Sequence, residues 1–163
     1  MWLELAAAQG DVRAMLSLGK LWLLGAQDFA PNAEKARTWF ERAMPDSNPQ
    51  AAYYLGLIAK SGYNQAPDHA QALKHFQFAA QQGIAEAMYL LGNAHANGEG
   101  TDIDTREAMR WYLRAAALDH PQAIQELAYA FARGDTLLPQ SDLQAANMLR
   151  AVEHALRHPK SAP

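Results

Sequence analysis

The feature that most constrains the fold of this chain is a repeat of about 36 residues. An alanine stands four residues before a leucine in each copy, and a glycine stands seven residues after it. The leucine is followed by a small residue, at intervals of 37, 36 and 36 residues: Leu18-Gly19, Leu55-Gly56, Leu91-Gly92 and Leu127-Ala128. Such a period indicates one supersecondary unit in about four copies, each of which buries its apolar side by stacking on its neighbours.

Each copy is predicted to form two helices. In the first copy, Ala14, Leu18, Leu21 and Trp22 have the i, i+4, i+7, i+8 spacing of an amphipathic helix. A glycine column follows the last turn, where a residue that adopts positive φ can end a helix. This column is Gly25, Gly62, Gly98 and Gly134. The second helix is expected to begin after a column of preferred N-cap residues. That column is Asn32, Asp68, Asp104 and Ser141.

Two of these N-caps have the sequence of a capping box. Asp104 is followed at three residues by Glu107, and Ser141 by Gln144. In a capping box the later side chain returns to the backbone amide of the N-cap residue. We therefore expect reciprocal hydrogen bonds at both helix starts.

A column of large residues lies in each second helix. It consists of Trp39-Phe40, His75-Phe76, Trp111-Tyr112 and Met148-Leu149. The small residue after each leucine is expected to leave room for a large residue of this column to approach the first helix. Apolar stripes on both helices then require neighbouring hairpins to stack.

The full pattern is most complete in the third copy. Its residues there are Ala87, Leu91, Gly92, Gly98, Gly100, Asp104, Ala108, Trp111, Tyr112, Ala115 and Ala116. This pattern closely resembles the Sel-one-like repeat (SLR) family, a relative of the tetratricopeptide repeats, and the resemblance covers nearly the whole chain. The expected fold is all-α, a right-handed α/α superhelix (solenoid) of antiparallel helix hairpins.

The spacing also predicts how the chain is organised. We expect a single solenoid over residues 1–158 and a flexible tail at 159–163. Trp2-Leu3 fits the column of large residues, so the chain begins inside a copy. The predicted units are a half repeat at 1–13 and repeats at 14–50, 51–86, 87–122 and 123–158. A capping helix is expected from Ser141 to about Arg157.

Composition narrows the classes of partner and of chemistry. The net charge of −3, the pI near 6.0 and the lack of a basic run argue against nucleic-acid binding. The chain has no cysteine, which excludes disulfides and thiol chemistry. No segment reaches the roughly 18 apolar residues of a membrane span. We expect a cytoplasmic protein, or a periplasmic or secreted one if a signal peptide has been removed.

The histidines offer little support for catalysis or metal binding. His75 and His95 lie in columns of large residues, so we expect packed, hydrogen-bonded core or semi-exposed side chains rather than ligands. His154 and His158 are four residues apart, but two ligands do not complete a metal site. No serine, histidine and carboxylate set is brought together by the repeat. We predict no enzymatic activity, no cofactor and no metal.

The candidate functional surface is the concave side, which the first helices usually line in an open helical stack. Its predicted residues are Arg13, Lys20, Gln50, Tyr53, Leu57, Lys60, Glu86, Tyr89, Asn93, Gln122, Gln125 and Tyr129. Leu16 and Leu23 are expected on the same face. Tyr53, Tyr89 and Tyr129 form an aromatic track that suits peptide binding, although such columns also serve packing.

Two functions follow from this fold. The family resemblance implies a scaffold or adaptor that binds a partner protein or peptide on the concave face. The alternative is a structural, self-assembling module or a piece of a larger repeat protein. In that case the apolar half repeat around Trp2, Leu3 and Leu5 would form a homodimer contact.

Overall fold

The computed structural model of the protein describes residues 2–25, 30–44, 47–63 and 65–133, the side chains of 131 and 132 excepted. These residues form helices and connecting turns, and none of them lies in a strand. The helices are α1 (Trp2–Ala8), α2 (Val12–Leu24), α3 (Ala33–Ala43), α4 (Pro49–Ser61), α5 (His69–Gln81), α6 (Ala85–Asn97), α7 (Thr105–Ala116) and α8 (Pro121–Ala132). The predicted all-α class is confirmed.

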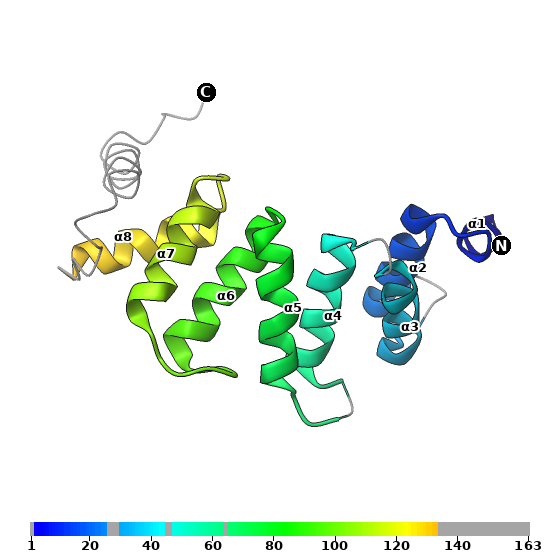
Figure 1. The fold of residues 1–163 in the computed structure, drawn as a ribbon, viewed down its shortest axis with the longest axis horizontal. Coiled ribbons are helices and arrows are strands. Elements are labelled where there is room, and N and C mark those ends of the chain that lie inside the picture. The colour runs from blue at the N-terminus through cyan, green and yellow to red at the C-terminus, as the bar shows by residue number, and fades with distance from the viewer. Residues whose placement is uncertain (1, 26–29, 45–46, 64, 134–163) are drawn as a thin grey trace. The chain divides into compact units, whose positions relative to one another are not determined.

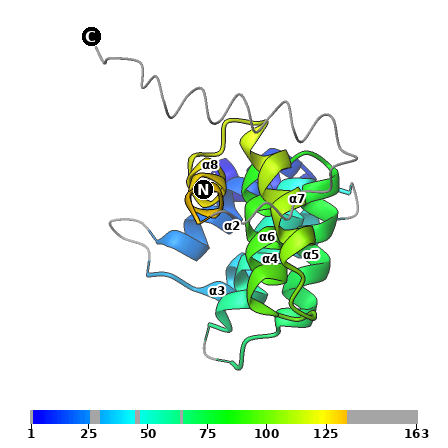
Figure 2. The same ribbon diagram turned by 90° about the vertical axis from the view of Figure 1, so that its left-hand side faces the viewer.

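Successive helices pair as hairpins. Helix α2 packs against α3, α4 against α5, and α6 against α7. Helices α4 and α5 lie side by side in both views (Figures 1 and 2). The chain divides into two compact units, Met1–Ile84 and Ala85–Pro163. In the first unit α1 also packs against α2 and α3 against α4, and in the second α7 packs against α8.

The small column of the repeat receives an aromatic ring in the α2–α3, α4–α5 and α6–α7 hairpins. Phe40 lies against Gly19, Phe76 against Gly56, and Tyr112 against Gly92. A Cβ atom at these glycines would lie 2.5, 2.6 and 2.5 Å from the nearest ring carbon. Side chains larger than glycine would therefore push the second helix away, which confirms the predicted pairing of small with large residues.

In the α2–α3, α4–α5 and α6–α7 hairpins the N-cap residue fixes the turn in two ways. The side chains of Asn32, Asp68 and Asp104 each accept a hydrogen bond, at 2.9 Å, from the backbone amide three residues later. Their own amides donate back to the first helix. These bonds run from Asn32 to the carbonyl of Trp22 (2.6 Å), from Asp68 to Ala59 (2.9 Å) and from Asp104 to His95 (2.9 Å). The N-cap residue thus starts the second helix and ties it to the end of the first.

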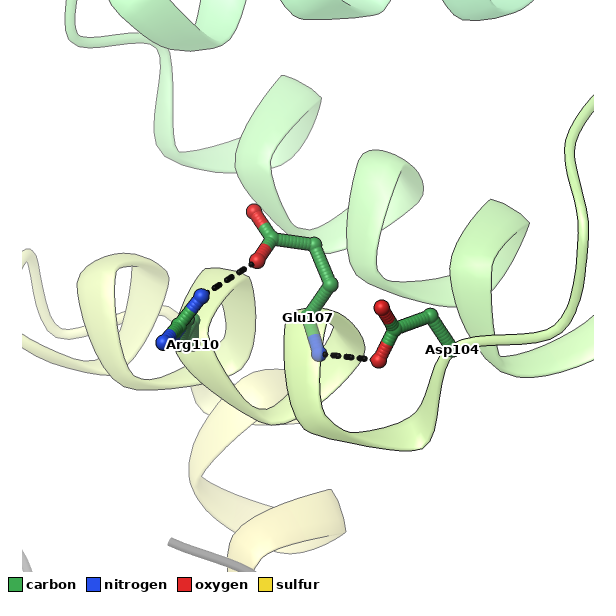
Figure 3. Close-up of polar contacts among 3 residues, drawn as sticks. All are labelled: Asp104, Glu107 and Arg110. Carbon is green, nitrogen blue, oxygen red and sulfur yellow. Dashed lines mark hydrogen bonds and ion pairs between the residues drawn. The ribbon is translucent and has the colours of Figure 1, made fainter. Parts of the chain in front are cut away.

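The predicted capping box at Asp104 forms only in part: the predicted bond from the Glu107 side chain to the Asp104 amide is wrong. Figure 3 shows that the amide of Glu107 donates to the Asp104 carboxylate, whereas the Glu107 carboxylate turns to the Arg110 guanidinium at 3.0 Å. The reason is that the Asp104 amide already donates to the carbonyl of His95. The second predicted box, Ser141 with Gln144, and the predicted capping helix lie outside the described residues.

The core follows the predicted apolar stripes. Phe40 and Ile58 are among the fully buried side chains of the first unit, and Leu91 and Leu127 among those of the second. Gly62 ends α4 in the left-handed conformation (φ 73°), where its amide donates to the carbonyl of Ile58. None of the described helices combines the length and the apolar character needed to cross a membrane.

Candidate partner-binding surface

The predicted surface residues lie on the first helices of the hairpins, α2, α4, α6 and α8, and most keep contact with solvent. The exposed ones are Arg13, Gln50, Glu86, Gln122, Gln125 and Tyr129. The half-buried ones are Lys20, Tyr53, Leu57, Lys60, Tyr89 and Asn93. Two further predictions are wrong: Leu16 and Leu23 are buried, because their side of α2 belongs to the core of the first unit.

In the first unit the surface is built on a cluster of aromatic rings. The ring of Tyr54 stacks on Phe40 with 4.8 Å between centroids and 8° between planes. Tyr53 meets Tyr54 edge-on at 5.1 Å and lies 6.4 Å from Phe76. The ammonium of Lys20 lies over the Tyr54 ring, 5.2 Å from its centroid. Residues of α2 and α4 are therefore held in place by the rings that fill the hairpin cores.

In the second unit the corresponding tyrosine also packs against neighbours. The Tyr89 ring lies 5.8 Å from Tyr112 and stacks on the His120 imidazole at 4.8 Å. The Tyr112 hydroxyl donates to the Asn93 side-chain oxygen at 2.7 Å. Burial raises the pKa of Tyr112 far above its ordinary value, and the charge of Glu126 adds to this effect. The phenol therefore stays protonated and remains a donor to Asn93.

Burial also acts on His120, whose pKa is lowered because desolvation disfavours the charged ring, while Glu86 partly opposes this. Its Nδ1 accepts a hydrogen bond from the amide of Ala123 at 3.3 Å. That bond requires an unprotonated Nδ1. His120 therefore acts as a neutral, stacked cap at the start of α8.

Tyr129 differs from the other two tyrosines of the predicted track. It is 54% exposed, and its hydroxyl accepts a hydrogen bond from the side-chain amide of Gln125 at 3.0 Å. Tyr53 and Tyr89 thus contribute to packing, whereas Tyr129 presents most of its ring to solvent. Tyr53 belongs to the first unit and the other two belong to the second.

A polar cleft of about 220 Å³ lies among α3, α4 and α5 in the first unit. Arg37, Glu41, Gln71 and His75 supply its polar groups. Desolvation lowers the pKa of His75, and Glu41 partly counteracts it. With one guanidinium and one carboxylate the cleft favours neither sign of charge, and it lies between helices rather than along the predicted face.

The described residues do not bring three His, Asp or Glu side chains together in a metal-binding arrangement. His75 and His95 are both half-buried, as expected. The Nδ1 atom of His95 is buried without a hydrogen-bond partner, so the expectation of a hydrogen-bonded ring is wrong for that atom. His154 and His158 lie outside the described residues.

Sequence reasoning missed three groups that support this surface: the Tyr54 ring, the His120 ring and the Tyr112 hydroxyl, which donates to Asn93. Tyr54 sits one position after the predicted tyrosine column, and its role depends on the ring of Phe40 from the preceding hairpin. The helical period predicts which face of its own helix a residue occupies. It does not predict at which position along that helix the next helix makes contact. His120 carried a signal, since it directly precedes Pro121 at a helix start.

The repeat can be compared with known families. The model of the Sel1 repeat matches residues 1–11, 12–43, 49–84, 85–120 and 121–151. The chain belongs to the Sel1 repeat family. Sel1 repeat proteins are generally helical scaffolds for protein interaction and are typically non-catalytic. A search of curated protein sequences gives no match.

Solved structures of Sel1 repeat proteins show the same architecture. The chain is 28% identical, with a TM-score of 0.79, to c5321, a protective antigen of uropathogenic Escherichia coli with an SLR fold. That match covers 94% of this chain but 32% of c5321, so this chain spans about a third of that protein. A Sel1 repeat protein from Oxalobacter formigenes is 29% identical, with a TM-score of 0.66, over 77% of this chain and 94% of that one.

Cysteine-rich protein B of Helicobacter pylori is more distant, at 19% identity and a TM-score of 0.58 over 74% of this chain and 91% of that one. This likeness concerns the fold alone. The present chain has no cysteine, so its hairpins are held by packing and hydrogen bonds without disulfides.

Proposed function

We propose that this Sel1 repeat chain is an adaptor that binds a segment of a partner protein on the concave face formed by its first helices. The observation that carries the proposal is the two-sided character of these helices. One side supplies the small and apolar residues of the hairpin cores, such as Gly56 and Leu91. The other side presents polar and aromatic groups such as Gln125 and Tyr129.

The presented groups are suited to recognition because many are already held in place. Tyr53 and Tyr89 pack against other rings, and Tyr129 is bonded to Gln125. A side chain that is fixed before binding loses little conformational entropy when a partner arrives. Tyrosine also combines a large contact area with a polar tip, which makes it frequent among residues that dominate binding.

Capture of partners by the full chain tests this function. The double substitution Gln125→Ala and Tyr129→Ala removes an exposed pair, four residues apart, from α8. The matched control is Gln77→Ala with Gln81→Ala, an exposed pair at the same spacing on the second helix α5. We expect the α8 variant to lose most of a partner that the wild type and the control both retain. Equal retention of the partner by all three proteins would argue against binding on the face formed by the first helices.

A second candidate function is self-assembly through α1. Trp2 is 84% exposed, Leu3 44% and Leu5 53%. An open hollow of about 510 Å³ lies between α1 and α2, with Trp2 and Leu3 in its wall. Clustered exposed apolar side chains on a small protein are typical of interaction sites.

Analytical ultracentrifugation over a range of micromolar concentrations separates the two candidates. If α1 mediates self-association, the wild type forms a dimer and Trp2→Ser shifts it to a monomer. A wild type that sediments as a monomer throughout would remove the self-assembly function and leave the adaptor function standing.

A further inference from the structure

The first helices of the two units carry opposite charges. Helix α2 contains Arg13 and Lys20, α4 contains Lys60, and neither contains Asp or Glu. In the second unit the charged residue of α6 is Glu86 and that of α8 is Glu126, and neither helix contains Lys or Arg. The chain as a whole is acidic, with a net charge of −3, so the basic character of α2 and α4 is local.

Lys20 is held over an aromatic ring. Its ammonium lies 5.2 Å from the centroid of Tyr54, and that ring is stacked on Phe40. Placement over an aromatic face limits the freedom of the lysine while leaving donors of its ammonium available. A carboxylate that approached from the open side would meet a cation that is already in place, which reduces the entropy lost on binding.

Within the described chain neither Arg13 nor Lys20 forms an ion pair. The acidic residue nearest to them in sequence is Asp11, which caps α2. Its Oδ1 accepts hydrogen bonds from the amides of Arg13 (2.8 Å) and Ala14 (3.1 Å). The carboxylate of Asp11 is therefore already engaged by backbone amides.

The spacing of the two cations indicates what could bind them. Arg13 and Lys20 are seven residues apart and lie on the same side of α2, which corresponds to a rise of about 10.5 Å along the helix. A polyproline II segment rises about 3.1 Å per residue with three residues per turn, so side chains three positions apart lie on one side, about 9.3 Å from each other. Carboxylates three positions apart in such an extended segment therefore match the two cations. Tyr53 and Tyr54 on α4 are half-buried, and the parts of their rings that stay exposed are available to apolar side chains of such a segment.

We propose that α2 and α4 of the first unit bind an acidic, extended segment of the partner protein, with carboxylates at Arg13 and Lys20. This inference rests on the adaptor function proposed above. A protein segment is favoured over nucleic acid because a duplex carries one charge per roughly 1.7 Å. Two unpaired cations in an acidic chain do not neutralise such a density of charge.

The test measures binding of fluorescein-labelled peptides to the full chain by fluorescence anisotropy. The first peptide consists of repeated Glu-Leu-Ser, and the second, repeated Gln-Leu-Ser, has the same shape without the charge. The surface variant is Arg13→Gln with Lys20→Gln. The control is Arg42→Gln with Lys74→Gln, which removes the same net charge from second helices. Each pair contains one cation stacked on a ring, Lys20 on Tyr54 and Arg42 on Trp39.

We expect the wild type and the control to bind the glutamate peptide more tightly than the glutamine peptide. The surface variant should bind the glutamate peptide roughly three- to tenfold more weakly, which is what the loss of two exposed charge pairs implies. Raising salt from about 0.05 M to about 0.5 M should weaken binding to the wild type more than binding to the surface variant. Unchanged thermal melting of both variants would show that the fold is intact.

Other outcomes overturn the proposal in distinguishable ways. If the glutamine peptide binds as tightly as the glutamate peptide, or if neither binds, the preference for acidic segments is wrong, and the adaptor function is still judged by partner capture. If the surface variant binds the acidic peptide as well as the wild type does, the assignment to α2 and α4 is wrong. Tighter binding of a single-stranded oligonucleotide than of the peptide would show that the surface prefers nucleic acid and that a protein segment is the wrong class of partner.

Discussion

At the scale of single residues, the hairpins depend on a glycine that admits an aromatic ring. In the α4–α5 hairpin a Cβ at Gly56 would lie 2.6 Å from the ring of Phe76, and Phe76 is 2% exposed. The ring is enclosed by the core and has little room to move away. The same relation holds for Gly19 with Phe40 and for Gly92 with Tyr112.

The substitution Gly56→Ala tests this contact. Alanine favours a helix over glycine by about 1 kcal/mol, but overpacking of a core destabilises by about 1–3 kcal/mol. We expect the clash to dominate, so urea unfolding should show a net loss of about 1 kcal/mol. In a Phe76→Leu background the same substitution should become neutral or stabilising. A stabilising effect in the wild type would contradict the packing described.

The lowered pKa values of two histidines make the stability of the fold depend on pH. Burial lowers the pKa of His75 and of His120 in the folded chain. Between the folded and the unfolded pKa the unfolded chain then binds more protons, so stability is full above the unfolded value of about 6.5 and falls as the pH decreases below it. Urea unfolding from about pH 7.5 to about pH 5.5 should show this loss, and His120→Gln should reduce its slope. An unchanged slope in His120→Gln would exclude a contribution from this residue.

The residue pattern predicted contacts that depend on the repeat itself and failed where neighbouring hairpins meet. The pairing of Gly19 with Phe40 follows from small and large columns at fixed spacing. Leu16 and Leu23 were expected on the concave face, but they are core residues. The role of Tyr54 was not predicted because its stacking on Phe40 depends on how α3 and α4 cross.

At the scale of the helix, the N-cap residues both start the second helix and close the hairpin. The sequence predicts Asn32, Asp68 and Asp104 as caps because short polar side chains are preferred there. It does not reveal that their amides bond to the first helix. At Asp104 that tertiary bond takes the place of the capping-box bond from the amide to the Glu107 side chain, and Glu107 pairs with Arg110 instead.

Two substitutions separate the roles of Asp104 and Glu107. Asp104→Ala removes the cap of α7 and should lower the free energy of unfolding by about 1 kcal/mol, whereas Asp104→Asn should preserve most of it. Glu107→Gln removes an exposed i, i+3 ion pair and should change stability by at most about 0.5 kcal/mol. Urea unfolding of the three variants measures these differences. A larger loss for Glu107→Gln than for Asp104→Ala would mean that the ion pair with Arg110, and not the N-cap, stabilises this helix start.

At the scale of the whole molecule, the period of about 36 residues was enough to predict an all-α Sel1 repeat chain. The reason is that the fold of a repeat protein follows from local residue spacing, and the same spacing recurs in each hairpin. The partner is not encoded in this way. In the proposed function recognition depends on residues such as the exposed Tyr129 and the half-buried Lys20, which can change without disturbing the glycine and aromatic columns.

Hydrogen–deuterium exchange of the full chain, alone and with a captured partner, locates the helices that a partner covers. If partners lie on the concave face, amides of α2, α4, α6 or α8 should gain protection on binding, while those of α3, α5 and α7 change little. Protection confined to the second helices α3, α5 and α7 would show that partners do not bind on the first helices.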